Sequence, residues 1–507
     1  MAGTLGDADL VPLAQRVTRP VHLVPHERDG TLGLSEVPAP TSVGTLPALY
    51  PEWLGERSFT EAHGVRFPYV AGEMAGGIAG VALVEAMARA EMLAFFGAAG
   101  LEPGRLDREL ARLRTSLAGR RNWGVNLIHH PQDPALEDEV ALRLLRAGVP
   151  KVSLSAFMDI TPAVVRCAAS GLRTDPTGRV VRDRAVFAKV SRPETAELFL
   201  SPPPADLVRR LVERGELTVE EGHLAARVPV ADDITVEADS GGHTDNRPLV
   251  AVLPAVLTLA RRSGRGVRVG AAGGLGDPAS VAAAFALGAA YVVTGSVNQM
   301  AVEAAVSDEA KAMLARAGVA DVAMAPAGDM FELGARVQVL RRGTMFAARA
   351  ARLHQLYTTH PSLESLPETT RRTLEHEVFG RPLDEVEKLT EEYWSRRRPA
   401  EVTRAREDPR HRMALTFRWY LGMAAAWATE GEASRRGDYQ LWCGPAAGAF
   451  NTWVAGSFLA DPARRTVTQI ARNLLQGAAV VTRAHQLRTL GVRLPAEAFA
   501  FRPRPLS

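Results

Sequence analysis

The residues best suited to chemistry in this chain lie in one polar run, Glu237–Pro248, which directly follows the apolar–polar alternation of residues 232–236. Gly241 and Gly242 have no Cβ, so a ligand can approach the backbone and left-handed dihedral angles cost no strain. His243 follows, and its reference pKa of about 6.5 makes it the side chain here best suited to move protons near neutral pH. The run therefore predicts a strand that ends at a functional site. The alternative is a tight turn whose polar residues only cap the next helix.

Two glycine-bearing turns follow successive apolar runs later in the chain. The first run, 267–272, leads through Gly273-Gly274 into a helix predicted over 278–287, and the second, 290–294, ends at Gly295-Ser296. Backbone N–H groups and the positive end of a helix both attract an anion, so the two turns predict a phosphate site. In a parallel α/β barrel such a site belongs to the loops after the seventh and eighth strands.

The glycines at 270–276 also loosely resemble a dinucleotide-binding fingerprint. That fingerprint belongs in the first βαβ unit of a chain, with an acidic residue about twenty positions further on. Here the glycines come after several strand–helix pairs. The order along the chain therefore favours the barrel.

Eight apolar runs alternate with helical patterns, such as 106–117 and 136–147, over about 240 residues, a usual size for a (β/α)8 barrel. The predicted strands are 67–71, 92–96, 123–128, 151–155, 185–190, a run that begins near Asp233, 267–272 and 290–294. The predicted fold is therefore an α/β TIM barrel.

The chain is longer than one barrel, because it has 507 residues. We assign residues 1–58 to an N-terminal extension with short strands and 59–300 to the barrel, which an inserted helical pair interrupts at 201–228. Residues 301–507 are predicted to be mainly helical and to lie on the substrate side. Aromatic and methionine residues recur there at helical spacing, which is typical of a core.

Composition describes an ordinary soluble globular protein, with 46% hydrophobic and 23% charged residues. No apolar stretch approaches the roughly 20 residues of a membrane helix, and the N-terminus lacks a signal-peptide pattern. Cys167 and Cys443 are the only cysteines, which favours a cytoplasmic protein with free buried thiols and no metal site built on cysteine. The net charge of +3 is small, so we expect neither nucleic acid nor a membrane as partner.

Several long motifs are spread over nearly the whole chain. They are Tyr69–Gly72, Phe95–Leu101, Ala188–Pro193, Glu237–Pro248, Ala325–Gly334, Arg418–Gly422 and Asp438–Pro445. On these residues the chain resembles the PfaD family of flavin-dependent enoyl reductases. These proteins act in trans in polyunsaturated fatty acid and trans-acyltransferase polyketide biosynthesis, and they belong with the nitronate monooxygenase-like barrels.

The resemblance implies that FMN binds at the C-terminal mouth of the barrel. Gly72 and Met74 are similar to residues that lie along the isoalloxazine ring, and Asn126 is similar to one that faces its pyrimidine edge. Lys189 would place a positive charge near flavin N1 and C2=O and stabilise an anionic reduced ring, unless it simply pairs with a carboxylate. The remaining positions implied at the phosphate or beside the cofactor are Ser240, Gly241, Gly242, Gly273, Gly274, Gly295 and Ser296.

The resemblance also implies a reaction, in which NADPH or NADH reduces the flavin and an enoyl thioester is then reduced across its α,β double bond. His243 is the candidate catalytic acid, because related monooxygenases use a histidine here as a base. A positioned proton donor is worth about 10²–10⁴-fold in rate. The alternative is that His243 only orients substrate or flavin. Asp245, Asn246 and Arg247 follow at once, and the sequence does not decide whether they hold His243 or contact substrate.

Two positions depart from the family pattern, which is expected to have a small residue at Glu73 and a serine at Gly80. A carboxylate beside the flavin would disfavour an anionic reduced ring. The exceptions are a Glu73 side chain that points to solvent or one that pairs with a cation.

The expected partner is an acyl carrier protein of a larger synthase, since no carrier, ketosynthase or acyltransferase segment is recognised. A homodimer is a further expectation that the sequence does not test. The arginines of segment 396–412 could dock an acidic carrier, although a solvated helical surface is the commoner meaning of such a segment. Two other classes of function stay open. One is a nitronate monooxygenase-like oxidase, and the other is a flavin-free docking or scaffold protein.

Overall fold

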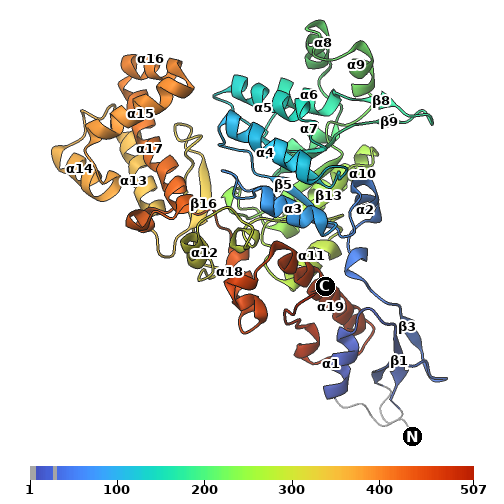
Figure 1. Cartoon of the computed structure of the whole chain (residues 1–507). Coiled ribbons are helices and arrows are strands. Elements are labelled where there is room, and N and C mark those ends of the chain that lie inside the picture. Colours follow the sequence, from blue (N-terminus) through green and yellow to red (C-terminus); the bar gives the residue numbers. More distant parts are fainter. Residues whose placement is uncertain (1–6, 27–30, 507) are drawn as a thin grey trace. The chain divides into compact units, whose positions relative to one another are not determined.

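The computed structural model describes residues 7–26 and 31–506, and the chain divides into two compact units (Figure 1). The first unit holds the described residues up to Asp239 together with 245–305 and 449–507, and the second holds 240–244 and 306–448. Within the described ranges, no helix has both the length and the apolar character needed to cross a membrane. Residues 1–6, which belong to the N-terminal segment predicted to lack a signal peptide, lie outside these ranges.

Eight parallel strands form a closed barrel in the first unit, which confirms the predicted TIM barrel. The ring closes where β14 pairs with β4, with Thr294 opposite Ala71. In the order around the ring, the strands are β4 (Tyr69–Ala71), β5 (Leu93–Phe96), β6 (Trp123–Ile128), β7 (Lys151–Ser155), β10 (Ala185–Val190), β11 (Asp233–Glu237), β13 (Arg268–Ala272) and β14 (Val292–Thr294).

Helices follow the strands and cover the outside of the barrel, which explains why the strands read as nearly continuous apolar runs. They are α3 (Val81–Arg89), α4 (Pro103–Ser116), α5 (Pro134–Arg146), α6 (Pro162–Ala169), α7 (Pro193–Leu200), α10 (Leu249–Ser263) and α11 (Pro278–Ala286). Five of these helices begin with proline in the first turn, where its missing N–H costs nothing. The predicted helical pair is also present, as α8 (Ala205–Glu213) and α9 (Val219–Ala225).

The amino end of the barrel is closed by helix α2 (Arg57–His63). Phe59 of this helix stacks on Tyr291 at 4.3 Å between ring centroids. His63 Nε2 lies 2.9 Å from a carboxylate oxygen of Asp233, the first residue of β11, which also pairs with Arg268, the first residue of β13. Because these contacts occupy the amino ends of the strands, ligand chemistry is left to the carboxyl ends.

A small antiparallel sheet precedes the barrel, with β1 (Val21–Pro25) between β2 (Leu32–Ser35) and β3 (Gly44–Leu46). The long helix α19 (Val467–Thr489) lies beside α11 and also joins the core under this sheet (Figure 1). That core includes Leu10, Leu23, Leu34, Leu487 and Val492. Residues from both ends of the described chain therefore share one apolar cluster.

The second unit is mainly helical, as predicted for this region, and its helices cluster around α17. The helices are α12 (Asp308–Leu314), α13 (Phe346–Thr359), α14 (Glu368–Thr373), α15 (Leu383–Arg397), α16 (Pro399–Glu407) and α17 (Pro409–Glu430). Met413, Phe417 and Tyr420 on α17 are fully buried, which confirms that this apolar stripe is core.

A three-stranded antiparallel sheet in the second unit was not predicted. Its order is β12 (Gly242–His243), β16 (Arg336–Leu340) and β15 (Val322–Pro326). The two-residue strand β12 belongs to the loop after the barrel strand β11, so this loop contributes residues to the second unit.

Candidate active site

The carboxyl ends of the barrel strands bring the predicted positions of the first unit to one end of the barrel. They come from the ends of β4, β6, β10, β13 and β14, and they are Gly72, Met74, Asn126, Lys189, Gly273, Gly274, Gly295 and Ser296. This is the end of a TIM barrel where active sites are found. Gly72 continues the barrel ladder, because its N–H donates to the Thr294 carbonyl at 2.9 Å.

A charged cluster lies at this end, around Lys189. The Lys189 Nζ is 3.0 Å from Glu237 Oε1 and 3.4 Å from Glu73 Oε1. The hydroxyls of Ser155 and Ser153 donate to the same Glu73 oxygen at 2.7 and 3.0 Å. Only 6% of the Glu73 side chain and 14% of the Lys189 side chain are exposed. Glu73 therefore points into the barrel mouth and pairs with a cation, which is one of the two exceptions left open by the sequence.

Both partners of this ion pair are charged near neutral pH. Burial opposes ionisation of Glu73, but Lys189 and the serine hydroxyls outweigh it and lower the pKa of the carboxyl. Burial likewise opposes protonation of Lys189, but Glu237 and Glu73 raise the pKa of its ammonium group. The cluster thus holds one positive charge against two carboxylates, so Lys189 is not an uncompensated cation.

The two glycine turns leave open space at the ends of β13 and β14. No heavy atom lies within 4 Å of the Cβ position of Gly274, where φ is +71°, or of Gly295. A Cβ on Gly273 would instead lie 2.7 Å from the carbonyl carbon of Ala238, so that glycine is required by packing. The backbone at Gly274 and Gly295 is therefore unobstructed on the side where a Cβ would lie, and backbone N–H groups in such turns can donate to an anion.

The N-terminus of helix α11 is capped by an acidic side chain. Its N-cap residue Asp277 accepts a hydrogen bond from the Ser280 N–H at 2.8 Å. The carboxylate therefore already satisfies part of the positive helix end on which the phosphate prediction relied. The unobstructed backbone beside Gly274 and Gly295 is therefore the observation on which an anion site would rest.

Asn126 offers a hydrogen-bond donor inside the mouth. Its Oδ1 accepts from the Ala98 N–H at 2.7 Å, and only 3% of the residue is exposed. Among the residues that the structure describes, its Nδ2 has no acceptor. A buried amide of this kind suits a ligand that presents a carbonyl oxygen.

The four remaining predicted residues, Ser240 to His243, belong to the second unit. They lie in the loop after β11, whose ends meet where the Asp239 N–H donates to the Arg247 carbonyl at 3.1 Å. A Cβ on Gly241 would lie 2.9 Å from the Cys443 nitrogen, and Gly242 has a φ of +86°. The protein's own backbone therefore makes the close approach that Gly241 permits.

His243 is held by a residue that the sequence did not single out. Its Nε2 lies 3.2 Å from Asp329 Oδ1, in the loop between β15 and β16. Asp245, in contrast, receives hydrogen bonds from Arg192 at 2.5 Å and from Ser191 at 3.2 Å, and Arg192 lowers the pKa of its carboxyl. The only sequence signal for Asp329 was its place in the motif Ala325–Gly334.

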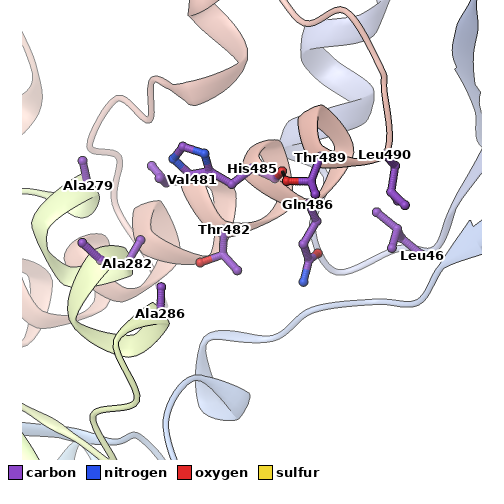
Figure 2. A pocket seen from close by; sticks show the side chains of 11 residues that line it. Leu46, Ala279, Ala282, Ala286, Val481, Thr482, His485, Gln486, Thr489 and Leu490 are labelled. Atoms are coloured by element: carbon purple, nitrogen blue, oxygen red, sulfur yellow. Dashed lines mark hydrogen bonds between the residues drawn. The ribbon is translucent and has the colours of Figure 1, made fainter. Parts of the chain in front are cut away.

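A second hollow in the first unit is a groove of about 720 Å³ on the outer surface of two helices (Figure 2). Its floor is mostly small and apolar, and polar side chains of α19 border it. The lining residues are Leu46, Ala279, Ala282, Ala283, Ala286, Val481, Thr482, His485, Gln486, Thr489 and Leu490. Because its lining has only one titratable side chain, His485, and includes none of the residues predicted at the barrel mouth, it is not the candidate active site.

Comparison with curated proteins finds relatives among synthases. The chain is 44% identical over 449 residues to one of the subunits of the polyunsaturated fatty acid synthase of Thraustochytrium sp., a match that covers 86% of this chain and 30% of that protein. It is 39% identical over 436 residues to polyketide biosynthesis protein PksE of Bacillus subtilis, a match that covers 85% of this chain and 56% of that protein. The chain thus spans from under a third to just over half of these relatives.

Two further comparisons concern the helical region and the whole fold. Residues 360–439 match the family described as acyl-carrier-protein S-malonyltransferase, inserted helical domain. The solved enoyl reductase domain of MlnA, from the macrolactin biosynthesis cluster of Bacillus amyloliquefaciens, is 35% identical with a TM-score of 0.82. That match covers 86% of this chain and 99% of the domain. The chain therefore belongs to the PfaD-type family of enoyl reductases of polyketide and polyunsaturated fatty acid synthases.

Proposed function

We propose that this chain is an enoyl reductase that uses FMN and NADPH or NADH to saturate the α,β double bond of an enoyl thioester on an acyl carrier protein. The observation that carries the proposal is the 35% identity and common fold with 99% of the MlnA enoyl reductase domain. In this reaction the nicotinamide loses a hydride, the β-carbon gains it, and the α-carbon takes one proton. The double bond becomes single and the nicotinamide becomes oxidised.

The barrel mouth has groups that suit each part of FMN. The open space beside Gly274 and Gly295 would take the phosphate, and the Asn126 Nδ2 would donate to a carbonyl of the pyrimidine edge. The backbone at Gly72 and Met74 would lie along the ring. When bound, FMN would supply the redox centre that passes hydride from nicotinamide to substrate.

The charged cluster changes the role that the resemblance implied for Lys189. A lone lysine near the ring would favour a negative charge on it. Here Glu73 and Glu237 both pair with Lys189. We therefore propose that the cluster carries a net negative charge toward the ring. In this cluster Lys189 holds the carboxylates of Glu73 and Glu237 in place.

His243 is the proposed acid for the α-carbon. It occupies the loop after β11, four residues beyond Asp239, and its ring is half-buried. Its partner Asp329 has the charge that favours a protonated ring. These contacts support proton transfer over the alternative of a ring that only orients the substrate.

A carrier-bound substrate is supported by the synthase relatives rather than by the arginine segment 396–412. Most of the arginines in this segment have acidic or aromatic neighbours. The pairs are Arg397–Tyr393, Arg398–Glu401, Arg406–Glu391, Arg410–Tyr357, and Arg412 with Glu364 and Glu387. Because these arginines already pair within the chain, segment 396–412 is better explained as a solvated helical surface than as a docking site for an acidic carrier.

The decisive experiment is stepwise reduction without oxygen. The purified chain is loaded with FMN, reduced by NADPH or by NADH, and then mixed with an enoyl thioester on a carrier protein. Reoxidation of the flavin with formation of the saturated thioester is the expected result. Fast oxygen consumption with nitronates and no turnover of the enoyl thioester would support the oxidase instead. Protein that takes up no FMN would contradict the proposal altogether.

A further inference from the structure

Three sequence motifs that are far apart in the chain meet around His243 in the second unit. His243 comes from the motif Glu237–Pro248, Asp329 from Ala325–Gly334, and Arg418 from Arg418–Gly422. His243 Nε2 lies 3.2 Å from Asp329 Oδ1. The Arg418 Nη1 lies 3.1 Å from Glu332 Oε1, three residues after Asp329 in the same loop. Of these residues, only His243 has a role in the proposed reaction.

The backbone around the histidine is fixed by strand pairing. In the ladder between β12 and β16, His243 faces Val337 and Gly242 faces Gln338. The Asp329 loop joins β15 to β16, so the strand that fixes His243 also fixes one end of that loop. The ring and the carboxylate are thus set by one small sheet, as a positioned pair requires.

Among the charges near the pair, Asp329 is one that lies within hydrogen-bond distance of the ring. Arg418 on α17 pairs with Glu332, so these two charges largely cancel each other. Arg336 begins β16, one residue before Val337, and its side chain is exposed. The Asp329 side chain is 39% exposed, so only partial burial opposes its ionisation, and His243, followed by Arg418, lowers the pKa of its carboxyl. An ionised carboxylate at this distance favours the imidazolium form of a histidine.

From this geometry we infer that Asp329 is a positioning residue for the proton donor His243, and that Arg418 and Glu332 anchor the loop that carries it. The inference rests on the proposed enoyl reduction for its purpose. Asp329 holds a proton on Nε2 of the neutral ring, so the second proton, which the α-carbon receives, is bound at Nδ1. Donation converts the imidazolium to the neutral ring, and Asp329 itself keeps its charge, as in other histidine–carboxylate pairs.

The test is a pH titration of His243 by NMR in the full chain with ¹⁵N-labelled histidine. The His243 signals are identified by their absence in His243→Gln. Asp329→Asn should lower the pKa of His243 by about one unit, because it removes the neighbouring negative charge. The matched control is Asp308→Asn, in the same unit, whose side chain is fully exposed, and it should leave the pKa of His243 unchanged.

Activity gives a second readout of the same pair. The rate should fall as the pH rises through the pKa of His243, and in Asp329→Asn this fall should begin about one pH unit lower. At pH 8 the variant should lose up to about six times more of its kcat/KM than at pH 6. Asp329→Glu, which keeps the charge, should restore much of the wild-type profile.

The outcomes separate this inference from the proposed reaction. If the pKa of His243 falls in Asp329→Asn but the wild type reduces no enoyl thioester, the pair stands and the proposed reaction is wrong. An unchanged pKa would overturn the pair, whatever the activity. The wild type supplies a further test that needs no variant, because the ¹⁵N shifts of the neutral ring must show the proton on Nε2, and a proton on Nδ1 would contradict the inference.

Discussion

Two carboxylates share one lysine at the mouth of the barrel, and Glu73 is the partner that departs from the family pattern. Glu73→Gln keeps an oxygen that can accept from Ser153 and Ser155, but it removes a negative charge. The remaining pair, Lys189 and Glu237, is then neutral overall. We expect the reduction potential of bound flavin to rise by tens of millivolts, since a tenfold change in a two-electron equilibrium equals about 30 mV.

Anaerobic spectroscopic titration against a reference dye measures this change. Glu213→Gln, an exposed glutamate on the helical insertion, is the control for a lost surface charge and should leave the potential unchanged. An unchanged potential in Glu73→Gln itself would show that the cluster does not act on the flavin.

The open space beside Gly295 allows a test of the phosphate site that spares the fold. Gly295→Ala places a methyl group where the protein has no atom within 4 Å, so the flavin-free chain should stay as stable as the wild type. The methyl group would occupy room needed by the phosphate, and we expect the Kd for FMN to rise at least tenfold. Gly437→Ala, in the second unit and equally unobstructed, is the matched control. The Kd for FMN is measured by flavin fluorescence. A wild-type Kd in Gly295→Ala would show that the phosphate does not bind beside Gly295.

His63 makes the stability of the barrel depend on pH. Burial lowers the pKa of His63, despite the neighbouring Asp233, so its folded-state pKa lies below the unfolded value of about 6.5. The unfolded chain then binds more protons in mildly acidic solution. The contribution is therefore complete above pH 6.5 and is lost as the pH falls toward the folded pKa, by at most about 1.4 kcal/mol per pH unit.

Urea unfolding at pH 7.5, 6.5 and 5.5 tests this dependence. The slope below pH 6.5 should be smaller in His63→Gln than in the wild type, whereas His223→Gln, at an exposed position on α9, should have the wild-type slope. Parallel curves for wild type and His63→Gln would exclude His63 as the titrating group.

At the scale of the elements, aromatic rings fill the barrel where glycines leave room. A Cβ on Gly270 of β13 would lie 2.3 Å from Cε2 of Tyr291, so Gly270→Ala overpacks the interior and should cost about 1–3 kcal/mol. Gly104 in α4 has only Arg108 Nη1 near its Cβ position, at 3.8 Å. Gly104→Ala should thus stabilise by up to about 1 kcal/mol. Chemical denaturation measures the change in the free energy of unfolding for both variants. Changes of the same sign would contradict this account of the barrel interior.

The barrel could be predicted because its strands are short, mostly apolar runs between turns. Three of them, 123–128, 151–155 and 185–190, were predicted with the bounds that the structure has. The strand β12 could not be predicted, since two residues have no periodicity and their pairing with β16 depends on a partner over ninety positions away. A separation of 86 positions likewise hid Asp329 as the neighbour of His243.

The candidate site was predictable only in part, for a related reason. Glycine turns mark strand ends in the sequence, so the predicted phosphate turns could be named in advance, whereas the positions along the ring, Lys189 among them, came from the family resemblance. The sequence does not show which charges meet at the barrel mouth. The partners of Lys189 are Glu73, just after β4, and Glu237 of β11, and their meeting depends on how the barrel closes. Their roles toward FMN stay predictions.

For the molecule as a whole, ligand binding should be visible in its stability. A ligand that binds only the folded state at 100 times its Kd stabilises it by about 2.7 kcal/mol. We expect FMN to raise the thermal unfolding midpoint and riboflavin, which has no phosphate, to raise it much less. Calorimetry with each compound at equal concentration is the measurement. Equal shifts would show that the phosphate turns beside Gly274 and Gly295 contribute nothing.

Helix α19 gives the order of synthesis a consequence for assembly. Ribosomes release the amino end first, so the small sheet and α11 emerge long before this helix, which follows the whole insertion 306–448. Until then, Leu23 and Leu34 lack the cover that Leu487 and Val492 later provide. The nascent chain therefore exposes the apolar face around Leu23 and Leu34 during translation. A chaperone that covers apolar surfaces would be needed until residues 306–448 and α19 have been synthesised.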